Sequence, residues 1–206
     1  MTLGTMATDC EIRIDYEKLR KDRLKKANEQ LKKDRLGALL CFDPDSIRYI
    51  TGTRLNDWTN NKLARACFLA ADRKPILYEI GSAIQTKETL CPWMKGYIFP
   101  FVGGFRGSFP GPVVLAKAER FAGMVASLLR EFGIIGEPLG VAFIEIPLMQ
   151  AMQKEGIRVV DGQQTLLAAQ AVKTAEEIEL IETSISIVEA AFWQVVNNAH
   201  PGKCWR

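Results

Sequence analysis

Residues that commonly carry out chemistry are sparse in this chain of 206 residues. The only histidine is His200, and no H-E-x-x-H, clustered Cys/His set or D-x-D pattern supplies a metal site. No G-x-S-x-G turn is present, so a Ser-His-Asp triad would depend on His200, which follows the last predicted helix. The sequence therefore predicts no catalytic residue and no metal ligand within the chain.

Two further patterns are better explained by structure than by chemistry. Glu176, Glu177 and Glu179 fall at the start of a predicted helix, where carboxylates favour the helix dipole. The glycine-rich segment 103–112 matches neither phosphate-binding pattern. It is predicted to be a connecting loop, with the gating of a site as the alternative.

Composition describes an ordinary globular protein. Hydrophobic residues make up 48% of the chain, charged residues 25%, and the net charge is +3. The five cysteines form no C-x-x-C pair, and neither a signal peptide nor a membrane-spanning run is evident. These features predict a cytoplasmic protein without disulfides and without a membrane partner.

Apolar segments with strand and helix patterns alternate along the chain. Strands are expected at 37–42, 66–71, 75–80, 96–101, 139–143 and 157–160, and helices at 16–33, 82–90, 112–132, 146–155 and 163–171. The strands on either side of Asp72-Arg73-Lys74 form a predicted hairpin. The pattern predicts an α/β fold with a mixed, mostly parallel sheet and helices on both faces.

Local signals refine three of these elements. Asp43 is expected to cap a short helix that begins at Pro44 and closes at Gly52. Ser82 is a candidate cap for the next helix, and Arg48 is expected to be a structural hydrogen-bond donor.

The helix at 16–33 is strongly basic, and it raises nucleic-acid binding as a possible function. Its thin apolar stripe, Leu24, Ala27 and Leu31, predicts a solvated outer helix instead. No aromatic residues interleave with the charges to stack on bases, so nucleic acid is an unfavoured partner.

A long helix of different character is expected at the C-terminal end. Thr174 and Glu177 form a capping box, and a single apolar stripe follows, made of Ile178, Ile181, Ile185, Val188, Phe192 and Val195. A stripe of this length must be buried against something.

The order of several short motifs resembles the N-terminal domain of the creatinase, prolidase and aminopeptidase P family, the pita-bread metallohydrolases. Segment 37–43 with Ile47-Arg48-Tyr49-Ile50-Thr51-Gly52 resembles the family's first strand and its N-x-x-Y-x-T/S-G turn. Segment 159–162 followed by 172–178 resembles its domain junction, R-x-x-K-(T/S)-x-x-E-(I/L). The Asp-Pro-x-x-Ile-Arg-Tyr form also resembles the dimethylsulfoniopropionate lyase branch.

The resemblance implies a ribonuclease H-like N-terminal domain at 16–171, after an N-terminal tail at 1–15. Residues 172–206 would then be the linker and first helix of a truncated pita-bread catalytic domain. In the family that domain binds a pair of divalent metal ions, such as Mn, Co, Zn or Fe, through two Asp, one His and two Glu. All five ligands would lie beyond Arg206, so no cofactor is expected in this chain and it would be inactive alone.

The resemblance also implies a role for the domain in oligomerisation and substrate gating, with a homodimer as the partner state. Trp58, Lys62 and Arg65 match the region whose aromatic and basic residues restrict the substrate in relatives. An exposed tryptophan beside positive charge suits a peptide or a small zwitterionic substrate. Xaa-Pro peptides, creatine-like compounds and dimethylsulfoniopropionate remain open as substrates.

Three hypotheses remain open at this point. The chain is the non-catalytic part of a metal-dependent Xaa-Pro peptidase or creatinase-like hydrolase, the N-terminal part of a dimethylsulfoniopropionate lyase, or a standalone protein- or peptide-binding module. Under the first, the helix with the apolar stripe is expected to drive self-association or to stay partly mobile.

Overall fold

A computed structural model describes residues 14–53, 65–103, 109–200 and 202. The chain divides into two compact units. One comprises residues 20–172 and holds the sheet with the helices that cover it. The other joins the residues up to Leu19 with those from Lys173 onward.

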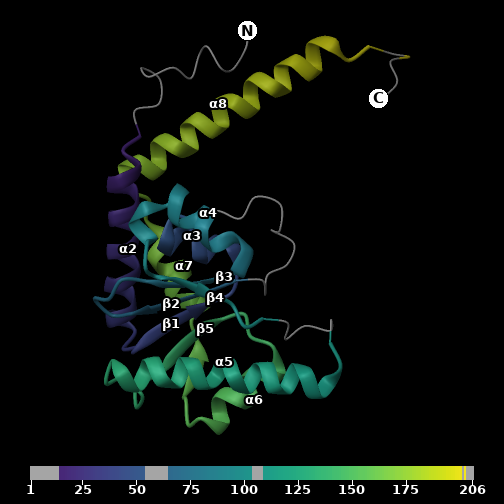
Figure 1. Ribbon diagram of the computed structural model, residues 1–206. Helices are drawn as coiled ribbons and strands as arrows, with labels where there is room; N and C mark the ends of the chain where they lie inside the picture. The colour runs from purple at the N-terminus through teal and green to yellow at the C-terminus, as the bar shows by residue number, and fades with distance from the viewer. Residues whose placement is uncertain (1–13, 54–64, 104–108, 201, 203–206) are drawn as a thin grey trace. The chain divides into compact units, whose positions relative to one another are not determined.

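The first unit is built on one six-stranded sheet with the order β4-β3-β2-β1-β5-β6 (Figure 1). Its strands are β1 (Ala38–Cys41), β2 (Ala66–Ala70), β3 (Ile76–Glu79), β4 (Ile98–Pro100), β5 (Leu139–Ala142) and β6 (Val159–Asp161). Only β2 runs against its neighbours, and the pairs β1–β5, β5–β6 and β3–β4 are parallel. The mixed, mostly parallel sheet predicted from the sequence is confirmed.

Helices cover both faces of this sheet, as predicted (Figure 1). One face packs against α5 (Gly111–Glu131) and α6 (Ile146–Lys154). The other packs against α3 (Pro44–Thr51), α4 (Ile84–Leu90), α7 (Gln163–Ala171) and the part of α2 (Tyr16–Lys33) that includes Ala27 and Leu31. Two short 3-10 turns, Gly81–Ala83 and Pro92–Met94, flank α4.

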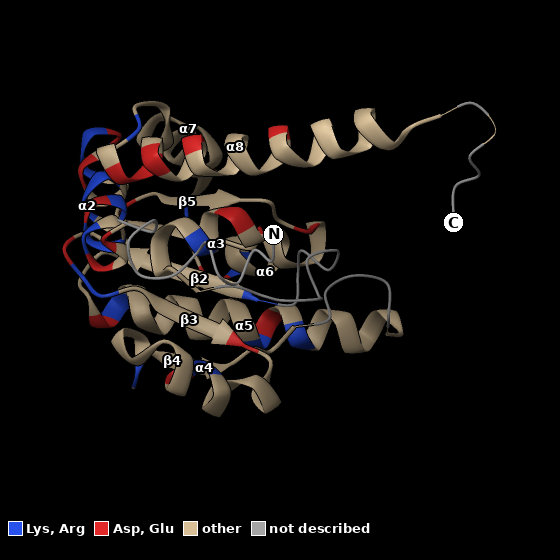
Figure 2. Cartoon of the chain, turned by 90° about the horizontal axis from the view of Figure 1, so that it is seen from above, with Lys and Arg blue, Asp and Glu red and all other residues tan. Residues whose placement is uncertain are grey.

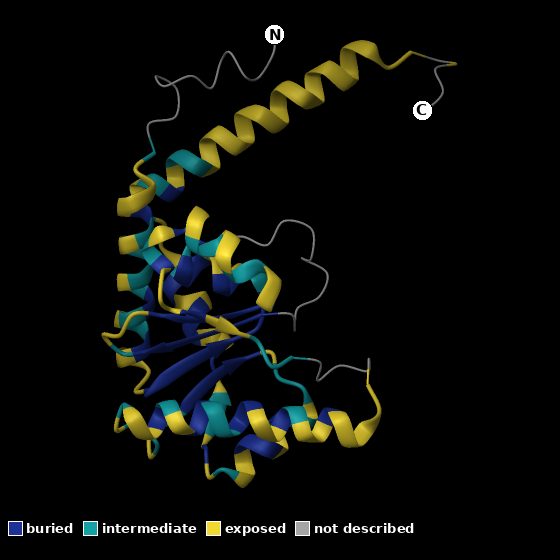
Figure 3. Cartoon of the chain, in the orientation of Figure 1, coloured by how far each residue is buried: buried dark blue, intermediate teal, exposed yellow. Residues whose placement is uncertain are grey.

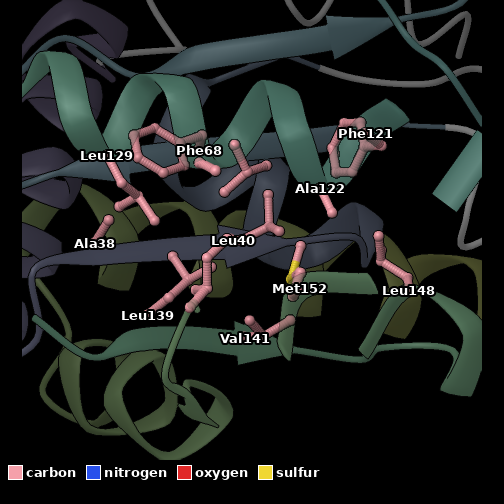
Figure 4. Close-up of a cluster of buried hydrophobic side chains, with 14 of the residues drawn as sticks. Ala38, Leu40, Phe68, Phe121, Ala122, Leu129, Leu139, Val141, Leu148 and Met152 are labelled. Carbon is pink, nitrogen blue, oxygen red and sulfur yellow. The ribbon is translucent and has the colours of Figure 1, made fainter. Parts of the chain in front are cut away.

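The four inner strands, β1, β2, β3 and β5, are buried on both sides, which explains their continuous apolar sequences (Figure 3). Along β1, Ala38 and Leu40 face α5 and α6, whereas Leu39 and Cys41 face the opposite helices. Figure 4 shows the α5–α6 side of this core, where residues from β1, β2 and β5 meet those of the two helices.

The turn after β1 folds as its residues predict. The Oδ1 atom of Asp43 accepts a hydrogen bond from the backbone N of Ser46 at 2.7 Å, which caps α3. Gly52 ends the helix in the left-handed region at φ 68°, and an added Cβ would lie 2.6 Å from the Cδ atom of Arg20.

Two local predictions are wrong. Ser82 caps no helix, because it lies inside the turn Gly81–Ala83 and α4 begins without a side-chain cap. The side chain of Arg48 is exposed and makes no hydrogen bond to the described residues, so it is not the structural donor that was expected.

In the second unit, α8 (Ala175–Asn198) begins with the predicted capping box. The backbone N of Glu177 donates to the Oγ1 atom of Thr174, and the backbone N of Thr174 donates to the Glu177 carboxylate. Lys18 and Glu176 form an ion pair at 2.5 Å within the same unit. The apolar stripe of α8 is exposed along its length (Figure 3), so the predicted burial of this stripe is not found among the described residues.

Candidate functional site

The carboxyl ends of the parallel strands are the natural place to look for a site in this fold. β1, β3, β4, β5 and β6 all end at the same edge of the sheet, and the antiparallel β2 begins there. Asp43 follows β1, Arg65 precedes β2, and Glu79 ends β3. Three ionisable side chains therefore come from three adjacent strands at this edge.

The strand register places the three side chains on one face. Continuing the pairing of Cys41 with Cys67 puts Asp43 opposite Arg65, and continuing the pairing of Ala66 with Tyr78 puts Arg65 opposite Glu79. Because side chains alternate along a strand, all three lie on the face covered by α2, α3, α4 and α7. The result is an acid–base–acid row across β1, β2 and β3.

Arg65 is the centre of this row. Its Nε atom lies 2.8 Å from the Oε2 atom of Glu79, and the two side chains are 1% and 0% exposed. Its Nη2 atom donates to the Oγ1 atom of Thr53 at 2.7 Å, and that oxygen lies 2.7 Å from the Oγ1 atom of Thr51. Thr51 in turn donates to the carbonyl of Ile47, which ties the network to α3.

Four buried polar atoms of the row make no hydrogen bond to the described residues: Nε and Nη1 of Arg65, Oε2 of Glu79 and Oδ2 of Asp43. Nε and Oε2 form the ion pair, which leaves Nη1 and Oδ2 without either kind of partner there. Burial lowers the pKa of the Arg65 guanidinium, while the nearby Glu79 carboxylate acts in the opposite direction. Together, an unpaired donor and an unpaired acceptor suit a group that both accepts and donates a hydrogen bond.

The thiols beside this row are not nucleophiles. Burial raises the pKa of Cys67 to about 12, and it raises the pKa of Cys41 well above its ordinary value. A thiol that stays protonated at neutral pH is unreactive, so both behave as small core residues. Both are free and buried in the core.

Only one of the three predicted gating residues belongs to the described part of the chain. Trp58 and Lys62 lie outside the described residues. Arg65 is described, and the structure places it in the core with Glu79 and Thr53 rather than at the surface. Thr53 and Arg65 stand on either side of segment 54–64, so their hydrogen bond joins the two ends of the segment that carries the other two residues.

A second candidate site lies on the opposite face of the sheet, beside α5. We call it the β4–α5 groove, an open hollow of about 690 Å³. Aromatic and apolar side chains form its floor: Tyr78, Tyr97, Phe99, Met124, Leu128 and Phe132. Three cationic side chains stand at its sides: Arg73, Lys74 and Arg120. Glu131 is the only acidic residue among those that line it.

Sequence reasoning missed this groove. Arg73 and Lys74 are visible in the sequence as a hairpin turn, but nothing local shows that the turn returns beside α5. Contacts across the fold hold two of the cations in place. Arg73 lies 4.9 Å from the ring centroid of Phe132, and the Nζ atom of Lys74 lies 4.1 Å from that of Tyr97.

The described part of the chain holds neither a cluster of metal ligands nor a membrane-spanning helix. No group of three or more His, Cys, Asp or Glu side chains there is arranged to hold a metal ion. None of the helices described combines the length and the apolar character that crossing a bilayer requires.

Comparison with known proteins relates the chain to two groups. No family model matches it. In sequence it is 23% identical over 193 residues to the dimethylsulfoniopropionate lyase DddP of Roseovarius nubinhibens, covering 93% of this chain and 42% of that protein. It is 25% identical over 184 residues to DddP of Roseobacter denitrificans, covering 86% of this chain and 39% of that protein. The chain thus spans about two fifths of the length of these relatives.

Solved structures share its fold. A Xaa-Pro dipeptidase from Bacillus anthracis superimposes with a TM-score of 0.61 at 15% identity, covering 89% of this chain and 45% of that one. The N-terminal domain of the cytoplasmic peptidase PepQ from Mycobacterium tuberculosis H37Rv gives a TM-score of 0.50 at 17% identity, covering 72% of this chain and 98% of that one. The chain has the α/β fold of the N-terminal domains of Xaa-Pro peptidases, and the resemblance drawn from its motifs is confirmed.

Proposed function

We propose that this chain is a non-catalytic N-terminal domain of a metal-dependent Xaa-Pro peptidase or creatinase-like hydrolase, serving oligomerisation and substrate gating. The match to the N-terminal domain of PepQ carries the proposal, because that domain, without its catalytic part, is covered over 98% of its length. The reaction, with any divalent metal pair, then belongs to a catalytic domain. A reducing, cytoplasmic setting suits the three buried free thiols, Cys41, Cys67 and Cys91.

The buried row at the sheet edge supports the gating role. Segment 54–64 carries Trp58 and Lys62, and the bond from Arg65 to Thr53 fixes the spacing of its two ends. Glu79 holds the guanidinium in turn, and neither charge is exposed. Arg65 therefore acts as a positioning residue for the segment, while Trp58 and Lys62 are the residues we propose to meet a peptide or small zwitterionic substrate.

A second candidate function is the N-terminal part of a dimethylsulfoniopropionate lyase. Sequence favours it, because two DddP proteins match over 93% and 86% of this chain. Under this proposal the domain role is unchanged, and only the substrate that passes the gating segment differs. The standalone binding module is the alternative with no catalytic partner, and a fold without a metal group in its described residues is compatible with it.

A chimera tests the gating role. Residues 1–200 of this chain replace the matching N-terminal part of the Roseovarius lyase, and turnover is measured with dimethylsulfoniopropionate. We expect the folded chimera to turn over substrate, and Trp58→Ala and Lys62→Ala to raise KM several-fold with kcat nearly unchanged.

The matched control is Arg158→Ala, a change of an exposed cation just before β6, which should leave KM as it is. Gating would be excluded if Trp58→Ala and Lys62→Ala chimeras behaved like the control. A chimera active on a Xaa-Pro dipeptide but not on dimethylsulfoniopropionate would favour the peptidase over the lyase.

A further inference from the structure

The β4–α5 groove is long, and different residues form its two ends. Arg120 and Phe132 both line it, and a helix that rises about 1.5 Å per residue sets them about 18 Å apart. Arg73 lies over the ring of Phe132, so the turn between β2 and β3 forms one end. The ring of Tyr78 packs edge-on against Phe121 with 5.4 Å between the centroids, so Tyr78 belongs with Arg120 at the other end.

Tyr78 brings a hydrogen-bonding group to the groove. Its side chain lines the groove, yet the residue is only 3% exposed, and its hydroxyl makes no hydrogen bond to the described residues. Buried tyrosine hydroxyls normally have a partner. Burial raises the pKa of Tyr78 to about 12, so the hydroxyl keeps its proton at neutral pH. It is therefore a donor suited to an anionic acceptor that enters from the groove.

The described residues do not neutralise the positive charge at this end. Arg120 is exposed and has no ion-pair partner in the described part of the chain. At the opposite end, Arg73 and Lys74 lie over aromatic rings, and Glu131 supplies a negative charge. In Figure 2 the densest group of Lys and Arg residues lies on α2, apart from those on α5. Arg120 and Tyr78 therefore form the end that suits an anion.

Between the two ends the floor of the groove is apolar. Phe99 and Tyr97 are 44% and 39% exposed there, and Met124 and Leu128 line the groove from α5. Covering such a surface with an apolar group is favourable, because the aromatic rings leave water. A volume of about 690 Å³ spread over about 18 Å makes a narrow channel, which suits a chain better than a fused ring system.

We infer that the β4–α5 groove binds a medium-chain alkyl carboxylate. Its carboxylate accepts hydrogen bonds from the hydroxyl of Tyr78 and the guanidinium of Arg120, and its chain lies over Phe99 and Tyr97 toward the turn between β2 and β3. One negative charge and one apolar chain match the exposed cation and the apolar floor. This site is independent of the gating role, because the groove and the Arg65 row lie on opposite faces of the sheet.

The first measurement is calorimetric titration of the 206-residue chain with hexanoate, octanoate and decanoate at low ionic strength. We expect one saturable site per chain and an affinity that rises about fourfold with each added methylene, because each methylene leaves water. Octanol has the chain of octanoate without its charge, and octylamine carries the opposite charge. Both should bind about tenfold more weakly than octanoate.

Three variants assign the contacts. Tyr78→Phe removes only the hydroxyl and should weaken octanoate binding about tenfold, and Arg120→Gln should weaken it several-fold. Both losses should be smaller for octanol, whose neutral hydroxyl is the weaker acceptor. Phe99→Ala removes part of the floor and should weaken both ligands. Arg158→Gln, a change of an exposed cation just before β6, is the matched control and should alter neither affinity.

Amide chemical shifts locate the ligand on the chain. They are needed because the exposed apolar stripe of α8 is another surface on which an alkyl chain can lie. The shifts caused by octanoate should fall on β3, β4 and α5. Circular dichroism of each variant checks that it is folded.

Four results would overturn the inference: no saturable binding of any carboxylate, equal affinity for octanoate and octanol, shifts confined to α8, or Tyr78→Phe and Arg120→Gln chains that bind octanoate as the parent does. A loss of affinity that Arg158→Gln reproduces would indicate attraction by net charge and would also overturn it. None of these results bears on the gating role, which the Trp58 and Lys62 variants of the chimera test separately.

Discussion

Arg65 shows how far a single residue can be judged from sequence. It follows a polar segment and precedes an apolar strand, and the family resemblance made it a candidate substrate-gating residue. Its true surroundings depend on strand pairing: β2 lies between β1 and β3, which places Arg65 beside Glu79. Pairing between strands is a long-range property that local spacing does not contain, and the β4–α5 groove was missed for the same reason.

The buried pair gives the first prediction. Arg65→Met removes one partner and leaves the Glu79 carboxylate buried and unpaired, which should cost about 3–5 kcal/mol of unfolding free energy. The double variant Arg65→Met with Glu79→Met should regain most of this loss, because no lone charge remains. Urea unfolding measures both. As a control, Lys154→Met breaks the exposed pair with Glu119 and should cost less than about 1 kcal/mol.

The second prediction concerns alkaline pH. Burial raises the pKa of Cys67 from its ordinary value of 9.0 to about 12, and that of Tyr78 from 10.0 to about 12. Both groups lose their protons at lower pH in the unfolded chain, so the unfolded chain binds fewer protons above pH 9 and stability falls as pH rises toward 12. Unfolding midpoints should decline over this window.

Two variants separate the contributions to this decline. Tyr78→Phe should flatten the part above pH 10. Cys67→Ala should reduce the part that begins near pH 9 without abolishing it, because burial also raises the pKa of Cys41 and of Cys91. A midpoint independent of pH between 9 and 12 in the parent chain would contradict this account.

At the scale of elements, most of the fold was predictable because the signals are local. Proline at the start of α3, the Asp43 cap, the Thr174–Glu177 capping box and the apolar runs of the strands all act over a few residues. Ser82 was misplaced because Gly81 and Ser82 enter a 3-10 turn before α4 begins. Periodicity defined the stripe of α8 but carried no information about what covers it.

The close approach of β5 to the start of α7 gives the third prediction. A Cβ added at Gly162 would lie 2.5 Å from the backbone C of Gly140, and neither backbone has room to move within the sheet. Gly162→Ala should therefore cost about 3 kcal/mol of unfolding free energy. Gly123 lies within α5, where an added Cβ would meet only the Oε1 atom of Glu155 at 4.0 Å, so Gly123→Ala should stabilise the chain by about 0.5–1 kcal/mol. Thermal or urea unfolding that gave equal changes would refute the packing described for β5.

At the scale of the whole molecule, sequence motifs pointed to a family of metallohydrolases and structure showed the fold of its N-terminal domains. The motifs do not identify the substrate. We propose that Trp58 and Lys62 meet the substrate beside a catalytic domain, and the motifs of this chain do not describe that domain's site. The solved structures that share its fold are peptidases, and its sequence relatives are lyases. The non-catalytic role is what we propose under either activity.

That role is tested most directly by assaying the purified 206-residue chain after incubation with Mn²⁺, Co²⁺ or Zn²⁺. The assay follows release of proline from Xaa-Pro dipeptides and of dimethyl sulfide from dimethylsulfoniopropionate. We predict rates equal to those of buffer with the same metal. Turnover above that level, abolished by a chelator and restored by metal, would show that this chain performs the chemistry itself and would contradict the account.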